Sequence, residues 1–141
     1  MGIEKISFKD SCHLKEKFAE GNFFIAEIDG KPIKTLEDYM RKIIEVFKFP
    51  EGLFKNLDNF DSYDDWMTDL SWLYERKWID KDNVGFVLFL YNFDKMMEDE
   101  PDRKKKIVYY FNESIIPFWK DEVENVIVGG KSRVFEVFIV K

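Results

Sequence analysis

The chain has very little cysteine and histidine: Cys12 and His13 are the single examples of each in 141 residues. One cysteine cannot form an intramolecular disulfide, so the fold does not depend on an oxidising compartment. Adjacent residues project in different directions, and no second histidine is available as a base, so this pair does not predict a nucleophilic site. We therefore expect neither a disulfide nor cysteine-based catalysis.

Long apolar runs, repeats and Pro/Gly-rich linkers are also absent. The longest apolar run covers residues 86–91, far short of the roughly 20 residues that a membrane-spanning helix needs. The first residues carry no apolar run typical of a secretory signal. These features predict a soluble cytoplasmic protein without a membrane partner. Residues 1–21 are polar and mixed and are assigned to an N-terminal extension, whereas residues 22–141 are assigned to one domain.

Negative charge is concentrated in one short segment. Residues 56–75 contain six carboxylates and no Lys or Arg, which leaves 22 acidic and 22 basic residues elsewhere. The whole formal charge of −6 therefore lies in this acidic segment. Binding to phosphates requires a positive surface, so we expect no direct nucleic-acid partner. The basic run at residues 103–106 follows several acidic residues and is typical of a solvated helix face.

Three apolar runs predict the strands. Residues 23–28 and 84–93 are typical of buried strands, and residues 134–140 supply a closing strand. Residues 6–8 also fit a short strand, and the glycine pair at 129–130 fits an extra C-terminal hairpin. Strands that alternate with helices predict an α/β fold, with a small, mostly parallel, three-stranded sheet packed with about three to four helices.

The helix after the first strand has the clearest pattern. Thr35 is placed as its N-cap, Asp38 completes a capping box, and Pro50 ends the helix. Its apolar residues recur at helical spacing: Leu36, Tyr39, Met40, Ile43, Ile44 and Phe47.

Two further helices are predicted. Ser62 or Asp61 caps the first, which is expected to run to about residue 78. The second is expected over residues 102–116, where Pro117 breaks or kinks it.

The carboxylates of the acidic segment are the strongest candidate site. Asp61, Asp65 and Asp69 are spaced i, i+4, i+8 and share one helix face, where like charges destabilise the helix. Helix capping accounts for Asp61 but less well for Asp69. Three interpretations remain open at this point: a solvated helix face, a hard-metal site that includes Asp58, and a docking surface for a basic partner that relieves the repulsion.

The order of residues around this segment resembles the barstar family of ribonuclease inhibitors. The resemblance rests on Phe-Pro-Glu at 49–51, on Asn-Leu-Asp at 56–58 and on Asp65 in the following helix. It implies a barstar-like domain over residues 22–141, with a small parallel sheet covered by helices. It also implies an inhibitor, not an enzyme, whose acidic side chains take the place of the RNA phosphate in the basic active site of a ribonuclease or toxin, without a cofactor.

The acidic surface and the resemblance together give the candidate partner-binding residues. The spacing between Asp58 and Asp65 is about three residues longer than the family pattern, so either Asp61 or Asp65 matches its helix carboxylate. Glu113 matches a family glutamate that faces the enzyme. The full set is Asn56, Asp58, Asp61, Asp65, Asp69, Trp72 and Glu113, with Phe54 as a further flanking contact. Two other functions stay open: a barstar-like scaffold for a basic partner that is not a nuclease, and a carboxylate-metal enzyme.

Overall fold

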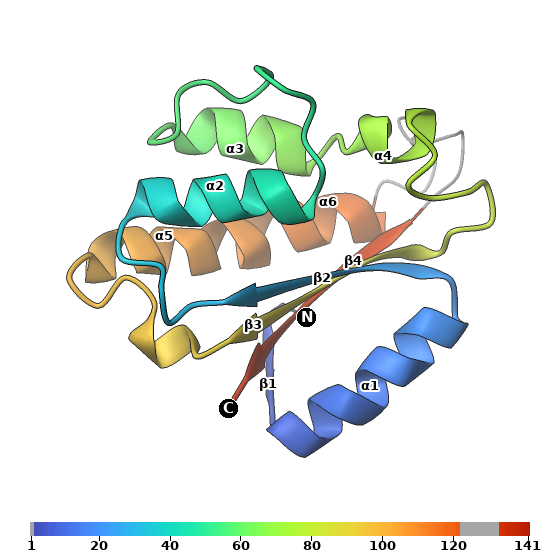
Figure 1. Cartoon of the computed structure of the whole chain (residues 1–141), viewed down its shortest axis with the longest axis horizontal. Coiled ribbons are helices and arrows are strands. Elements are labelled where there is room, and N and C mark those ends of the chain that lie inside the picture. Colours follow the sequence, from blue (N-terminus) through green and yellow to red (C-terminus); the bar gives the residue numbers. More distant parts are fainter. Residues whose placement is uncertain (1, 122–132) are drawn as a thin grey trace.

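Four parallel strands form the central sheet, in the order β1-β4-β3-β2 (Figure 1). The computed structural model describes residues 2–121 and 133–141. The strands are β1 (Glu4–Ile6), β2 (Phe23–Asp29), β3 (Gly85–Tyr91) and β4 (Val134–Val140). The prediction of an α/β fold with a mostly parallel sheet is confirmed, but the described sheet has four strands where three were expected. The hairpin expected at residues 129–130 lies outside the described residues.

Helices cover both faces of the sheet, and α1 lies alone on one side (Figure 1). The helical segments are α1 (Phe8–Glu20), α2 (Leu36–Val46), α3 (Phe60–Met67), α4 (Ser71–Glu75), η1 (Phe93–Lys95), α5 (Pro101–Tyr110), η2 (Phe111–Ile115, a π-helical segment) and α6 (Ile116–Asp121).

The second face of the sheet is covered by a segment that the sequence pattern left unassigned. Leu14 and Phe18 of α1 pack on a small apolar cluster that includes Phe89 and Phe138. A parallel sheet needs cover on both faces, and this is why β3 is almost entirely buried. The short strand predicted at residues 6–8 lies two residues earlier, as β1, and the chain enters α1 at Phe8. Residues 4–20 are thus built into the sheet and its cover.

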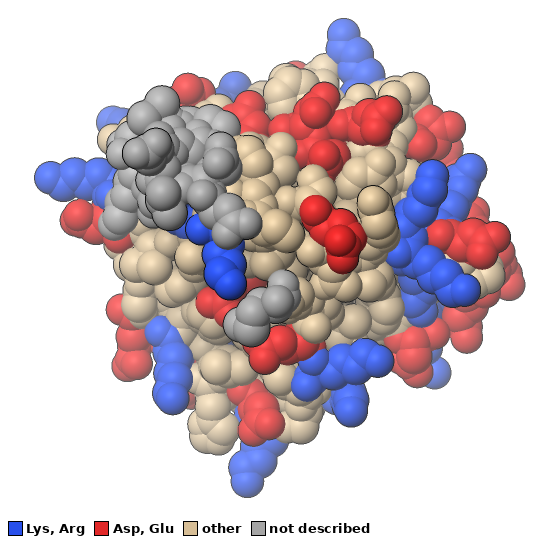
Figure 2. Space-filling view, turned by 180° about the vertical axis from the view of Figure 1, so that it is seen from behind, with Lys and Arg blue, Asp and Glu red and all other residues tan. Residues whose placement is uncertain are grey.

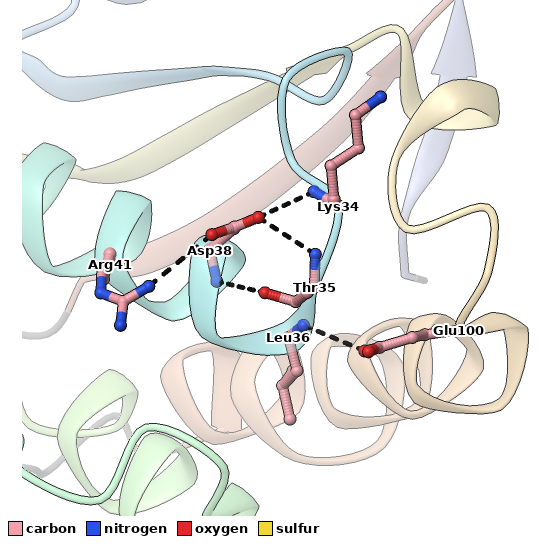
Figure 3. Close-up of polar contacts among 6 residues, drawn as sticks. All are labelled: Lys34, Thr35, Leu36, Asp38, Arg41 and Glu100. Atoms are coloured by element: carbon pink, nitrogen blue, oxygen red, sulfur yellow. Dashed lines mark hydrogen bonds and ion pairs between the residues drawn. The ribbon is translucent and has the colours of Figure 1, made fainter.

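The start of α2 follows the predicted capping box (Figure 3). The Thr35 hydroxyl accepts the Asp38 N–H at 3.1 Å, and the Asp38 carboxylate accepts the Thr35 N–H at 3.2 Å. The backbone N–H of Lys34 also donates to Asp38, and this hydrogen bond holds the pKa of the carboxyl below its ordinary value. Glu100 accepts the Leu36 N–H at 3.0 Å, so the segment before α5 supplies a second cap to α2.

The helix predicted to run to about residue 78 is divided into α3 and α4. Asn59, not Ser62 or Asp61, caps α3, because its side chain accepts the Ser62 N–H at 3.0 Å. Beyond Met67 the chain leaves the helix, and Leu70 adopts left-handed backbone angles (φ 55°) before α4 begins. Leu70 itself is fully buried.

The helix predicted over residues 102–116, with a break or kink at Pro117, does not end there but continues to Asp121 through η2 and α6. Four of its buried residues are spaced four apart, namely Ile107, Phe111, Ile115 and Trp119, and Ile116 is buried beside them. In a regular α-helix each four-residue step overshoots a full turn by about 40°, so this stripe would drift around the helix. The wider η2 turn, in which the Ile116 N–H bonds to the Phe111 carbonyl, keeps it on one face. The η2 segment also lies directly before Pro117, which has no N–H to donate to the preceding turn.

A buried pair of hydroxyls joins α2 to α3, since Tyr39 and Tyr63 are both fully buried and their oxygens lie 2.8 Å apart. Tyr63→Phe is expected to lower the free energy of unfolding by about 1–3 kcal/mol, because it leaves the Tyr39 hydroxyl buried without this partner. Tyr39→Phe is expected to lower the free energy of unfolding by a similar amount, because it leaves the Tyr63 hydroxyl without the same partner. The double change should cost no more than either single change, and urea unfolding of the three variants measures this. Additive losses would contradict a shared hydrogen bond.

Candidate functional site

The acidic segment is seated on the long helix formed by α5, η2 and α6. At the start of α3, the Phe60 ring stacks on Tyr110 of α5, with centroids 5.2 Å apart and planes 4° from parallel. One turn later, the Ser114 hydroxyl of η2 donates to the Asp64 carboxylate at 2.6 Å. These two contacts fix the position of α3 along the neighbouring helix and its rotation about its own axis.

The end of the acidic helix is held by two tryptophans. Trp119 of α6 donates its indole N–H to the Met67 carbonyl at 2.9 Å. Trp72 of α4 donates its indole N–H to the Phe47 carbonyl, just after α2, at 2.8 Å. Both indoles are buried, so these hydrogen bonds form away from water and tie α3 and α4 to their neighbours.

The carboxylates of Asp58, Asp61 and Asp65 remain at the surface. All three residues are exposed, and none of the ion pairs among the described residues includes them. Asp61 and Asp65 lie one turn apart on α3, and Asp58 lies in the turn before it. In Figure 2 acidic side chains gather along the upper part of the visible face, at the height of α3. We call Asp58, Asp61, Asp65 and Glu113 the acidic face.

A shallow hollow of about 310 Å³ lies at the start of this face. The side chains of Asp58 and Asp61 meet Lys106 and Tyr110 of α5 there, and the lining residues are Asn56, Asp58, Asn59, Phe60, Asp61, Lys106 and Tyr110. The Lys106 ammonium lies 5.4 Å from the centroid of the Phe60 ring. The hollow is therefore lined by two aspartates, two asparagines, a lysine and two aromatic residues.

The repulsion expected from the sequence acts on Asp64. Partial burial raises the pKa of this carboxyl, and the negative charges of Asp65 and Asp61 raise it further, whereas the Ser114 hydrogen bond lowers it. The pKa of Tyr110 is also raised, first by burial and then by the charges of Asp61 and Asp64. The ionised form of Asp64 therefore lowers the free energy of unfolding at neutral pH.

Glu113 reaches the surface from η2, on the helix against which α3 packs. It is exposed, and none of the ion pairs among the described residues includes it. Its neighbour Ser114 donates a hydrogen bond to Asp64, so Glu113 is one residue away from a direct contact with α3. The structure thus brings together two parts of the chain that the sequence separates by about 50 residues.

Three of the expected surface residues are placed differently. Trp72 is only 4% exposed, and this burial corrects the expectation that it flanks a partner. Phe54 is likewise buried and stacks on Phe49, with centroids 5.9 Å apart. Asp69 is half-buried, and its carboxylate accepts the Ser71 N–H at 3.0 Å, so it shapes the turn into α4. Asn56 is exposed beside the hollow.

Lys106, Tyr110 and Ser114 were missed by the sequence analysis. The spacing of Tyr110 and Ser114, four apart and each one residue before a position of the buried stripe, is a signal that could have placed them on one flank of α5 and η2. No sequence signal pairs that flank with α3, because the contact depends on the tertiary fold.

The possible metal ligands do not come together in the described part of the chain. Among residues 2–121 and 133–141, no group of three or more His, Cys, Asp or Glu is placed to hold a metal ion. Over the same residues, no helix has the length and apolar character to cross a membrane.

The sequence matches a known protein family. A family model described as barstar (barnase inhibitor) matches residues 23–129. A search of curated proteins returned no match. The matched region begins at β2, runs through α6 and contains the whole acidic face, whereas β1 and α1 precede it.

Removal of the charge at Asp64 should stabilise the protein at neutral pH. The folded-state pKa of Asp64 is raised, so the folded state favours the protonated form and loses stability as pH rises through that pKa. Asp64→Asn keeps an oxygen for Ser114 without the charge. We expect a higher Tm than wild type at pH 7 and a gain that shrinks as pH falls below about 4 and is lost near pH about 3, where aspartate is mostly protonated in both states. Thermal unfolding across this range measures it.

The exposed Glu20, at the end of α1, provides the control. Glu20→Gln should leave the pH dependence of Tm unchanged. A lower Tm for Asp64→Asn at pH 7 than for wild type would show that the hydrogen bond to the charged carboxylate outweighs burial and repulsion.

Proposed function

The chain belongs to the barstar family of barnase inhibitors, and we propose that it binds a basic ribonuclease or related toxin and occludes its active site. The observation that carries the proposal is the acidic face: exposed carboxylates on a helix that is fixed by buried contacts. In the complex these carboxylates occupy the positions that RNA phosphates take among the enzyme's cationic side chains. Inhibition then requires no turnover and no cofactor.

Charge supports this function in two ways. The carboxylates of the acidic face repel one another in the free protein, and a cationic partner relieves that repulsion on binding. The concentrated negative field also steers a basic enzyme towards this surface and raises the association rate, an effect that salt screens. Both effects predict binding that weakens as ionic strength rises.

Asp61 and Asp65 form the centre of the proposed contact. Both are exposed on α3 one turn apart, so a single partner surface reaches them together. Asp58 and Asn56 extend the contact around the hollow, and Glu113 extends it onto η2. The longer spacing after Asp58 therefore adds a carboxylate to the surface, and the two alternatives suggested by the sequence act as a pair.

The seating of α3 supports tight binding. Ordering mobile side chains and loops on association reduces affinity, and a face that is already fixed avoids much of that cost. The ring stack, the Ser114 hydrogen bond and the Trp119 hydrogen bond hold α3 before any partner arrives.

Barnase provides the probe for this proposal. Wild type is expected to inhibit RNA cleavage by barnase, and Asp61→Ala, Asp65→Ala and Glu113→Gln are each expected to weaken binding about tenfold or more, because each removes a hydrogen bond between charged groups. Titration calorimetry at low and high salt gives Kd, and a cleavage assay gives inhibition. Salt should weaken the wild type more than the variants.

Glu20→Gln is the matched control, since it removes one negative charge from α1, on the other side of the sheet (Figure 1). It should bind and inhibit like wild type. Binding without loss of RNA cleavage would indicate a barstar-like scaffold with another role. Equal affinities for all of these variants would exclude the acidic face as the contact.

A further inference from the structure

The N-terminal segment reaches the helix that carries Glu113. The backbone N–H of Ile3 donates to the side-chain oxygen of Asn112 in η2 at 2.8 Å. Gly2 lies so close that a Cβ on it would collide with the Asn112 side chain. These residues precede the region matched by the family, which begins at residue 23. A segment outside the family match therefore contacts a residue next to the acidic face.

Glu113 lies between two anchored neighbours. Asn112 is bonded to the N-terminal segment through Ile3, and Ser114 is bonded to α3 through Asp64. The two hydrogen bonds span 109 and 50 residues of sequence, so neither is a local feature of the helix. The exposed Glu113 side chain thus extends from backbone that is held on both sides.

The turn that carries Glu113 needs such anchors. A π-helical turn has a different hydrogen-bond spacing from the α-helices on either side, and such turns are frequent at functional sites. Pro117 donates no N–H to the turn before it, which reduces the backbone hydrogen bonds available there. Side-chain bonds from Asn112 and Ser114 add connections to the rest of the fold on both sides of Glu113.

We propose that residues 2–6 act as a positioning element for partner binding: β1 fixes Ile3, Ile3 fixes Asn112, and Asn112 holds η2 so that Glu113 is presented beside the carboxylates of α3. The inference rests on the proposed inhibitory function and gives the N-terminal segment a part in it. Ile3 and Asn112 are positioning residues, because they act on the partner through Glu113.

The test uses two substitutions at one position in the full chain. Ile3→Pro and Ile3→Ala both remove the Ile3 side chain, but only the proline removes the N–H that Asn112 accepts. Ile3→Pro is expected to bind barnase about three- to tenfold more weakly than Ile3→Ala, because the partner must then order η2 itself. Gly2→Ala, which displaces the Asn112 side chain, is expected to act in the same direction.

A double-mutant cycle with Glu113→Gln separates positioning from general destabilisation. In the Glu113→Gln background, Ile3→Pro and Ile3→Ala should bind equally, whereas in the Asp61→Ala background their difference should persist. A difference that remains without Glu113, or equal binding in the wild-type background, would overturn the inference.

Amide hydrogen exchange of the free protein provides a readout that needs no partner. Ile3→Pro should accelerate exchange in η2 relative to Ile3→Ala while leaving α2 unchanged. If wild type does not bind barnase, the inhibitory proposal fails by itself, and exchange still decides whether the N-terminal segment holds η2. Equal exchange in the two variants would overturn the positioning role whatever the binding result.

Discussion

The seating of α3 on the helix formed by α5, η2 and α6 is the constraint on which the rest of the structure depends. Contacts at three points along α3 hold it in place. They are the Phe60–Tyr110 ring stack, the hydrogen bond from Ser114 to Asp64 and the hydrogen bond from Trp119 to the Met67 carbonyl. The buried faces of both helices meet along this line, so the carboxylates have only the outer surface left to occupy. The acidic face is therefore a consequence of how the core is packed.

This arrangement divides the negative charge between two tasks. Asp64 is drawn in to hold α3 against η2, and burial raises its pKa. Asp58, Asp61 and Asp65 stay exposed and form none of the ion pairs among the described residues. A fold that uses one carboxylate as an internal connection and leaves its neighbours in water tolerates their repulsion, because water screens most of it at the surface.

The sheet connects this surface to the N-terminus. A parallel sheet requires cover on both faces, and α1 supplies the cover that the region matched by the family does not include. β1, which leads into α1, pairs with β4 and brings Ile3 to Asn112. The segment that completes the sheet thus also reaches η2, so stability of the fold and order of the acidic face share one part of the chain.

The sequence by itself determined the local features whose causes lie within a few residues. Thr35 and Asp38 predicted their capping box, continuous apolar runs predicted the central strands, and the spacing of Asp61 and Asp65 predicted a shared helix face. Tertiary structure decided what depends on distant partners. Leu70 adopts left-handed backbone angles that interrupt the predicted helix, and the later helix continues past Pro117 through η2. Trp72 turns inward, where the Phe47 carbonyl accepts its N–H. No local pattern records these contacts, since each joins elements that approach one another only when the chain is folded.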